Sequence, residues 1–195
     1  MMKHTTHTKR GLPTQAGFTL IETLVAVSLL SVSIVAPMAL TTQSLTAAYY
    51  ARDQVTAFNL AQEGIEAIRA IRDGQILQIS QNANATGIDL FGPIPVDQDF
   101  TIDSRQSSPS NAIQTCSGTC GALQTDGTLF GYDPDRTTWV PTHFTRTMRV
   151  RYVGAGHDEI RVSATVSWPT ASGQVRTFTI YENLYRWVND GAAST

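Results

Sequence analysis

The apolar residues of this chain first form an uninterrupted stretch. Residues 17–40, GFTLIETLVAVSLLSVSIVAPMAL, are apolar, small or hydroxyl-bearing apart from one charge, Glu22. About 20 such residues are enough for a helix to cross a bilayer. Positive charge flanks this stretch on its N-terminal side, at Lys3, Lys9 and Arg10. The pattern therefore predicts one membrane-spanning helix with a cytoplasmic N-terminus and an exported remainder.

The pattern then changes to that of an amphipathic helix. Between Val55 and Asp73, apolar residues recur every three or four positions and predict a face that packs on a core: Ala57, Phe58, Ala61, Ile65, Ile68 and Ile71. Gly74 follows as a predicted C-terminal cap. Pro37 lacks an amide donor, so we expect it to kink or locally melt the helix. One long helix from Phe18 to about Asp73 is predicted.

Alternation of apolar and polar residues predicts strands in the last third of the chain. The alternating segments are Phe144–Val153, Glu159–Trp168 and Val175 to about Tyr181, with a further short strand at Phe100–Ile102. A smaller hairpin is expected between residues 129–132 and 138–140. Short connections indicate an antiparallel meander. The expected fold class is α+β, with the long helix covering one face of the sheet.

The residues around Glu22 carry a resemblance to a known family. A basic leader that ends at Gly17, followed by FTLIE and an unbroken apolar run, resembles the cleavage and methylation signal of type IV prepilins and type II secretion pseudopilins. The resemblance implies that a prepilin peptidase cuts between Gly17 and Phe18 and that the new Phe18 amine is methylated. The helix stays in the mature subunit.

The same resemblance implies a division of the chain and a function. Residues 1–17 would be the leader, 18–40 the transmembrane and filament-core segment, 41–74 the amphipathic continuation, and 75–195 a pilin head. The phrases LAQEGIEAIRAIRD, VSW and LYRW are similar to segments of minor pilins. The implied role is structural, not enzymatic. The implied partners are prepilin peptidase, other pilin or pseudopilin subunits, an inner-membrane assembly platform and the lipid bilayer, and the implied destination is a pilus or secretion filament.

Glu22 has a chemical reason to stand at this place. Cleavage would turn Phe18 into an N-terminal ammonium, and Glu22 lies one helical turn further on. The carboxylate could pair with the ammonium of its own chain or with that of a neighbour. Removing one partner of a buried ion pair leaves an uncompensated charge. An intersubunit pair would make Glu22 an assembly residue.

A second function class is an exported or membrane-tethered binding or enzymatic domain behind an ordinary signal sequence or anchor. An ordinary signal peptide would be cleaved between Ala36 and Ala48. The apolar run is longer than the usual core of about 7–15 residues, and Glu22 interrupts its beginning. Both features favour the filament interpretation. His143 and His157 are not surrounded by a nucleophile motif.

Cys116 and Cys120, in TCSGTCG, predict a short-range disulfide in an exported domain. A redox pair or a zinc site is the alternative, but two further zinc ligands are not nearby in the sequence. No cofactor is expected. Calcium remains an alternative at one of two carboxylate groups, Asp97, Asp99 and Asp103 or Asp133 and Asp135, although EF-hand spacing is missing.

Charge bears on the possible partners. Removing the three leader cations from 14 basic residues leaves 11 against 16 acidic residues, a net charge of −5. This balance argues against a general polyanion-binding surface. Four strand arginines leave two interpretations open, either arginines that are solvated or pair with Asp158 and Glu159, or a basic strip that captures DNA: Arg146, Arg149, Arg151 and Arg161. The charge balance favours the first.

Overall fold

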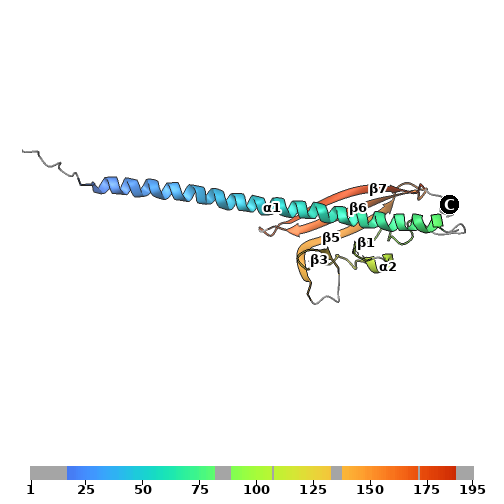
Figure 1. Ribbon diagram of the computed structural model, residues 1–195. Helices are drawn as coiled ribbons and strands as arrows, with labels where there is room; N and C mark the ends of the chain where they lie inside the picture. Colours follow the sequence, from blue (N-terminus) through green and yellow to red (C-terminus); the bar gives the residue numbers. More distant parts are fainter. Residues whose placement is uncertain (1–16, 82–88, 107, 133–137, 171, 188–195) are drawn as a thin grey trace, which may run out of the picture. The chain divides into compact units, whose positions relative to one another are not determined.

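The computed structural model describes residues 17–81, 89–106, 108–132, 138–170 and 172–187. The chain divides into two compact units, Met1–Ala48 and Tyr49–Thr195. Helix α1 (Leu20–Gln81) begins in the first unit and ends in the second, and all strands of the described residues lie in the second (Figure 1). The predicted α+β class is confirmed, with the long helix and antiparallel sheet of a pilin-like architecture.

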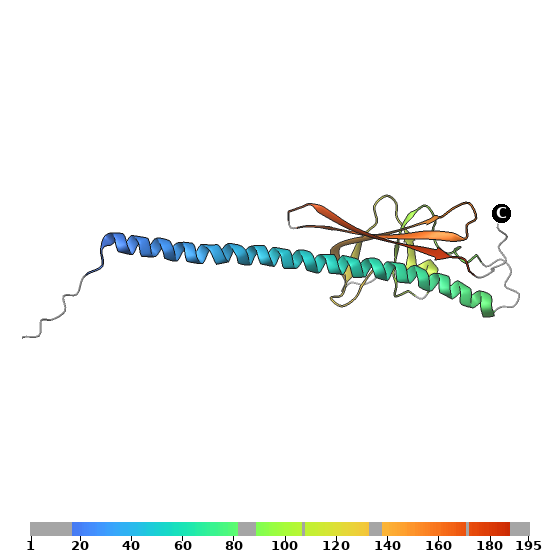
Figure 2. The ribbon, with the colours of Figure 1, turned by 90° about the horizontal axis from the view of Figure 1, so that it is seen from above.

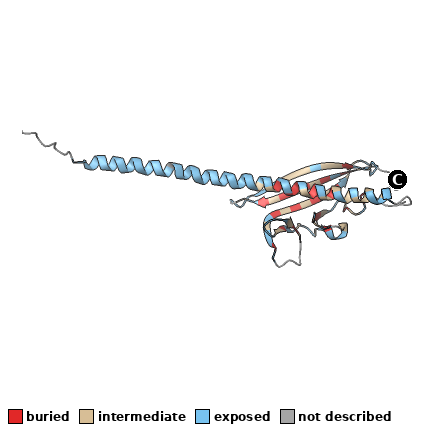
Figure 3. Cartoon of the chain, in the orientation of Figure 1, coloured by how far each residue is buried: buried red, intermediate tan, exposed pale blue. Residues whose placement is uncertain are grey.

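The part of α1 in the first unit exposes its side chains all round (Figure 3). Its hydroxyl groups donate back to carbonyls three or four residues earlier, as Ser28 does to Leu24 at 2.8 Å and Ser31 does to Val27 at 2.8 Å. The helix thus satisfies these polar groups internally, which a lipid environment requires. The exposed large apolar side chains include Leu20, Ile21, Leu24, Val25, Val27, Leu29, Leu30, Val32, Ile34 and Val35.

Pro37 lies inside the continuous α1 helix, so the chain does not melt there, and the expected kink remains a prediction. Proline removes one backbone hydrogen bond, which would have ended at the carbonyl of Ser33. The hydroxyl of Thr41 donates to the Pro37 carbonyl at 2.9 Å, and that of Ser33 donates to Leu30 at 2.8 Å. Helix propagation on both sides outweighs the one lost bond.

The second half of α1 covers one face of the sheet in the second unit (Figures 1 and 2). Four of its buried residues confirm most of the predicted apolar face: Ala57, Ala61, Ile65 and Ile68. Phe58 is 40% exposed and meets Phe178 edge to face at 5.7 Å between ring centroids. Leu60, which was not predicted, is buried.

The helix ends later than predicted. It continues through Gly74 to Gln81, so the predicted cap at Gly74 is wrong. Ile76 and Ile79 are half-buried and pack against the core of the second unit. Burial of these two side chains offsets the cost of a helical glycine, which is about 1 kcal/mol relative to alanine.

Three long strands form the predicted antiparallel meander. Strand β5 (Val140–Tyr152) pairs with β6 (Glu159–Pro169), which pairs with β7 (Val175–Tyr185). Each is close to the segment that alternation predicted, because one face of each strand contributes to the core. We call the other face, which carries Arg149 and Arg151 on β5 and Ser163 on β6, the outer face of the sheet.

The opposite edge of β5 carries the shorter strands. Both β1 (Asp99–Ile102) and β3 (Ala122–Thr125) pair with β5; β2 (Ile113–Thr115) adds to β1, and β4 (Phe130–Gly131) adds to β3. The short helix α2 (Pro109–Ala112) precedes β2. The hairpin expected between residues 129–132 and 138–140 is wrong, because both segments pair with β3. Residues 133–137 lie outside the described residues.

Two glycines of α1 are expected to respond with opposite sign to alanine. A Cβ at Gly64 would lie 2.8 Å from Met148 Sδ and 3.2 Å from Arg146 Cδ, both on fully buried side chains, whereas a Cβ at Gly74 would meet nothing within 4 Å. Gly64→Ala should therefore lower the free energy of unfolding by about 1–2 kcal/mol through overpacking. Gly74→Ala should raise it by up to about 1 kcal/mol. Chemical denaturation of the full chain in detergent measures both, and equal effects would contradict the close packing at Gly64.

Candidate functional site

The predicted cleavage site lies immediately before α1. Gly17, Phe18 and Thr19 are outside the helix, and α1 begins at Leu20. Phe18 is 80% exposed, and nothing would approach a Cβ at Gly17 within 4 Å. The Gly17–Phe18 peptide bond is thus neither helical nor covered by the described part of the chain. A peptidase needs its substrate bond in such an accessible form.

Thr19 is a site residue that the sequence predictions missed. Its carbonyl accepts hydrogen bonds from the amides of Glu22 at 3.1 Å and Thr23 at 3.2 Å, and its hydroxyl lies 3.4 Å from the Glu22 amide. Threonine followed three residues later by glutamate is the sequence of a capping box. The spacing was visible in the sequence. Thr19 caps α1 and so keeps the Gly17–Phe18 bond out of the helix.

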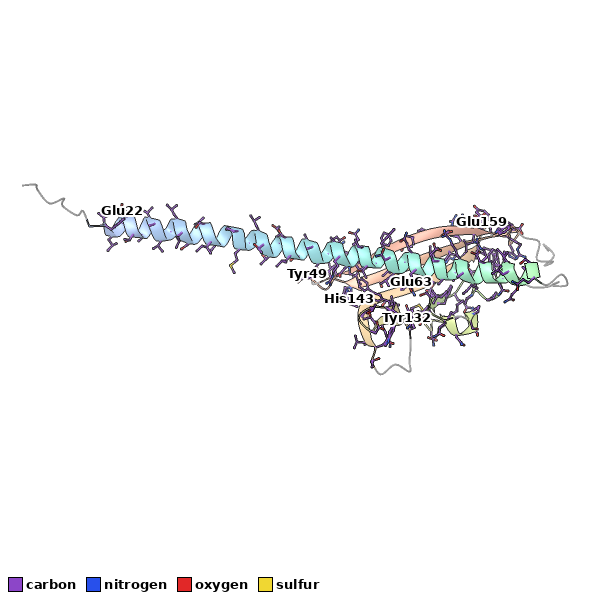
Figure 4. All side chains as sticks on the ribbon, viewed as in Figure 1. Glu22, Tyr49, Glu63, Tyr132, His143 and Glu159 are labelled. Atoms are coloured by element: carbon purple, nitrogen blue, oxygen red, sulfur yellow. A yellow bond between two sulfur atoms is a disulfide. The ribbon has the colours of Figure 1, made fainter. Side chains whose placement is uncertain are left out.

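Glu22 lies in the first turn of α1 with its side chain exposed (Figure 4). The partial positive charge of a helix N-terminus favours a carboxylate at this place. In the uncut chain the nitrogen of Phe18 is an amide, so the proposed ammonium partner does not yet exist. The nearest basic residues in the sequence are Arg10 and Arg52. The expected ammonium partner of Glu22 would therefore exist only after the predicted cleavage.

Cys116 and Cys120 form the predicted disulfide, with their Cα atoms 5.0 Å apart. Gly118, between them, has φ +97°, a left-handed conformation that glycine adopts without strain. The amide of Cys116 also donates to the carbonyl of Asp99 at 2.8 Å. The bond closes a small loop next to β1, which agrees with the expected export to an oxidising compartment.

The carboxylates weighed for calcium each face an arginine instead of one another. Asp97 pairs with Arg151 at 3.6 Å and Asp99 with Arg149 at 2.5 Å. Among the described residues, no group of three or more His, Cys, Asp or Glu side chains could hold a metal ion. Asp133 and Asp135 lie outside the described residues.

Asp103 is buried and is held by a bidentate contact with Arg105. Burial disfavours its charged form, but hydrogen bonds from the Arg105 guanidinium and from the Tyr132 and Arg105 amides outweigh that effect and lower the pKa of Asp103. Arg105 also lies over the ring of Trp139 at 4.2 Å. The pair orders the segment after β1 and leaves Asp103 as the anion of an internal ion pair.

Arg146 is a second residue whose role the alternation pattern did not reveal. In the alternation of Phe144–Val153, Arg146 falls at a position of the apolar set, between Phe144 and Met148, and the structure buries it completely beneath α1. Its guanidinium donates to the carbonyls of Leu60 at 2.9 Å and Ile102 at 2.6 Å and pairs with Glu63 at 3.4 Å. Glu63 also accepts a hydrogen bond from Ser104 at 2.6 Å. Arg146 thus joins the helix, β1 and β5.

Tyr132, which is labelled in Figure 4, forms a hydrogen bond with this arginine. Its hydroxyl donates to the Arg146 carbonyl at 3.2 Å, and burial raises its pKa to about 12. The phenol therefore remains a donor throughout the physiological pH range. Glu63 and Tyr132 complete a polar cluster around the buried Arg146, where an unpaired polar group would be costly.

The remaining strand arginines lie on the outer face. Arg149 and Arg151 on β5 and Arg161 on β6 share that face, so the hypothesis of a strip that includes Arg146 is wrong. The carboxylates that pair with them are Asp97 and Asp99 instead of the expected Asp158 and Glu159. His143 pairs with Asp53 at 3.6 Å, and His157 stacks on Tyr152.

Comparison with known proteins identifies the N-terminal segment. Residues 12–36 match the family model of the prokaryotic N-terminal methylation motif. No curated protein and no solved structure matches the chain. The matched segment contains Gly17, Phe18, Thr19 and Glu22. One helix of the described residues, α1, is long and apolar enough to cross a membrane. The chain therefore carries a type IV prepilin-like leader before a pilin-like α+β architecture, and this combination is consistent with a pilin or pseudopilin precursor.

Proposed function

We propose that the chain is a minor pilin or pseudopilin that enters or primes a type IV pilus or a related secretion filament. One observation carries this proposal: an exposed Gly17–Phe18 bond stands directly before an apolar helix whose first turn contains Glu22. A cut at this bond creates an ammonium one turn from the carboxylate. A structural subunit needs this arrangement, whereas a soluble enzyme does not.

The proposed path begins in the inner membrane. The basic leader, residues 1–17, stays in the cytoplasm, and the 18–40 segment crosses the bilayer. Prepilin peptidase removes the leader and Phe18 is methylated. The 41–74 segment and the 75–195 head are exported. The exposed apolar surface of α1 supports this path, because side chains of that kind need lipid or the helices of other subunits as neighbours.

Assembly follows from the same exposed surface. We infer that Glu22 pairs with the Phe18 ammonium of a neighbouring subunit as the helix leaves the lipid for the filament core. A platform protein in the inner membrane would receive the subunit. The head, held to its helix by Arg146, would be displayed on the filament. No catalytic step is assigned to the chain.

The mature N-terminus tests the proposal. Mass spectrometry of the protein from sheared filaments and from membranes should find N-methylated Phe18 as the first residue, because the bond before it is exposed. The Gly17→Val variant should retain Met1 or the next residue and stay in the membrane, since a branched side chain would stand at the cut. Gly74→Ala, a glycine change far from the cut, should be processed normally.

Two other N-termini would contradict the proposal. A first residue between Ala36 and Ala48 would show an ordinary signal peptide and a released domain. A wild-type chain that keeps its leader in the membrane fraction would show a simple anchor. Either result would favour an exported or tethered binding or enzymatic domain.

A further inference from the structure

The outer face of the sheet carries a hollow that is lined by arginines. Ser163 on β6 forms its floor, because this small residue stands between Arg149 on β5 and Tyr181 on β7 in the strand register. The hollow has a volume of about 560 Å³. We call it the arginine cleft and define it by Arg149, Arg151, Arg161, Ser163 and Tyr181.

Two of these arginines face each other across the strands. Arg151 on β5 and Arg161 on β6 are directly opposite in the register. Like charges in this position destabilise a sheet. An anion between the two guanidinium groups would turn this repulsion into attraction. The pair therefore has an unfavourable arrangement in the empty cleft and a favourable one around an anion.

The neighbouring polar groups engage the arginines through their Nε atoms. Arg149 Nε donates to Asp99 Oδ1 at 2.5 Å, and Arg161 Nε donates to the neutral amide oxygen of Asn183 at 3.1 Å. Arg151 Nε lies 3.6 Å from Asp97, and both of these side chains are more than 60% exposed. An exposed pair of this kind is weak. These contacts do not use the Nη atoms, which form the fork that grips a phosphate.

We propose that the arginine cleft binds a nucleotide unit, with its phosphate between Arg151 and Arg161 and its base on Tyr181. A guanidinium fork matches two phosphate oxygens in geometry and charge. Tyr181 is 68% exposed, so its ring is available for stacking, which accepts any base. A volume of this size suits a small ligand.

The ligand could be a free nucleotide or one unit of a single strand, and both present the same chemistry. The negative net charge of the processed chain does not oppose such a site, because three arginines are gathered at the cleft. A strand should thus make only one or two phosphate contacts, which gives a log–log salt dependence with a slope of about −0.7 to −1.4. The proposal does not depend on the filament role.

Fluorescence anisotropy on the full chain in nonionic detergent tests this inference. The probe is a labelled single-stranded DNA hexamer, and the competitors are a nucleoside monophosphate, inorganic phosphate and an abasic strand of equal length. We expect the hexamer to bind, and the abasic strand and inorganic phosphate to bind at least about fivefold more weakly, because they cannot stack on Tyr181. If the nucleoside monophosphate binds as tightly as the hexamer, free nucleotides are the ligand. If the hexamer binds more tightly, the ligand is a single strand.

Variants of the cleft distinguish binding at this site from nonspecific electrostatic attraction of the probe to the chain. The double variant Arg151→Gln with Arg161→Gln should bind about tenfold or more weakly, whereas Asp97→Asn should bind more tightly because it frees Arg151. Arg176→Gln is the matched control, since Arg176 is exposed on β7 opposite Trp168 and away from the cleft. Thermal unfolding should show that the double variant is at least as stable as wild type, because it removes the like-charge pair.

Three results would overturn the proposal. The first is that none of the probes binds the wild-type chain. The second is that Arg176→Gln lowers affinity as much as the double variant does. The third is that Asp97→Asn and the double variant both leave the affinity unchanged.

Discussion

A chain with Glu22 replaced by alanine is expected to lose its leader normally and to be absent from the filament. The scissile bond lies outside α1 and does not need the carboxylate, so prepilin peptidase should still cut before Phe18. The new ammonium would then have no partner among the apolar helices. An uncompensated buried charge costs several kcal/mol, so we expect about tenfold or more less protein in sheared filaments.

The structure also gives Glu22 a competing role, because its backbone lies in the Thr19 cap. The Glu22→Gln variant separates the two roles. Glutamine at this position still permits a capping box, but it cannot neutralise an ammonium. If charge pairing drives assembly, Glu22→Gln should fail as Glu22→Ala does. Thr19→Ala, which weakens the cap and keeps the carboxylate, should assemble at close to the wild-type level.

The measurement compares the sheared filament fraction with the membrane fraction by immunoblot, and mass spectrometry checks the N-terminus of each variant. Ser28→Ala is a matched control, because its hydroxyl donates only within the helix. Normal filament levels of Glu22→Gln would contradict the electrostatic role. Normal levels of Glu22→Ala would remove Glu22 from assembly altogether.

The Arg146→Ala variant should lose about 3–5 kcal/mol of stability. The change leaves the carbonyls of Leu60 and Ile102 without this donor and opens a cavity between α1 and the sheet. For a chain of this size, each kcal/mol shifts the Tm by about 2–4 °C, so a fall of about 10 °C is expected. The head would be held less firmly on its helix.

Thermal and urea unfolding of the full chain in detergent, monitored by circular dichroism, measure this loss of stability. Arg146→Met is the matched variant, because it fills most of the cavity with an apolar side chain, and it should recover at least half of the loss. Glu63→Gln should cost less than Arg146→Ala, since the Glu63 side chain is 34% exposed. A loss below about 1 kcal/mol for Arg146→Ala would show that this contact does not hold the helix on the sheet.

The main elements of the fold were predictable because each one buries a regular face. The three-to-four-residue spacing from Ala57 to Ile71 placed the second half of α1 on a core, and strict alternation placed β5, β6 and β7. The cap predicted at Gly74 is wrong, and α1 also continues as a helix through Pro37. Each carries a local cost of a few kcal/mol or less, which tertiary burial or helix propagation outweighs.

The functional residues likewise include some that the sequence predicts and some whose contacts it does not. Gly17, Phe18 and Glu22 are close in sequence, so a short motif reveals them, and the local cap at Thr19 follows from the same six residues. The arginines of β5 are different, because two of them, three positions apart, differ in burial. Arg146 is fully buried and Arg149 lies on the outer face. Alternation alone places Arg146 on the apolar face of β5, but the groups to which it hydrogen-bonds lie on α1 and β1 and could not be predicted from the strand.

The sequence by itself determined the processing signal, the apolar segment, the amphipathic helix, the meander and the cysteine pair, because each depends on residues within a few turns or one strand of each other. Only the tertiary structure decided that Arg146 is buried against Leu60 and that Arg151 faces Arg161. Those contacts depend on strand register and on the packing of helix against sheet. Both are set by the whole buried core and not by any local pattern.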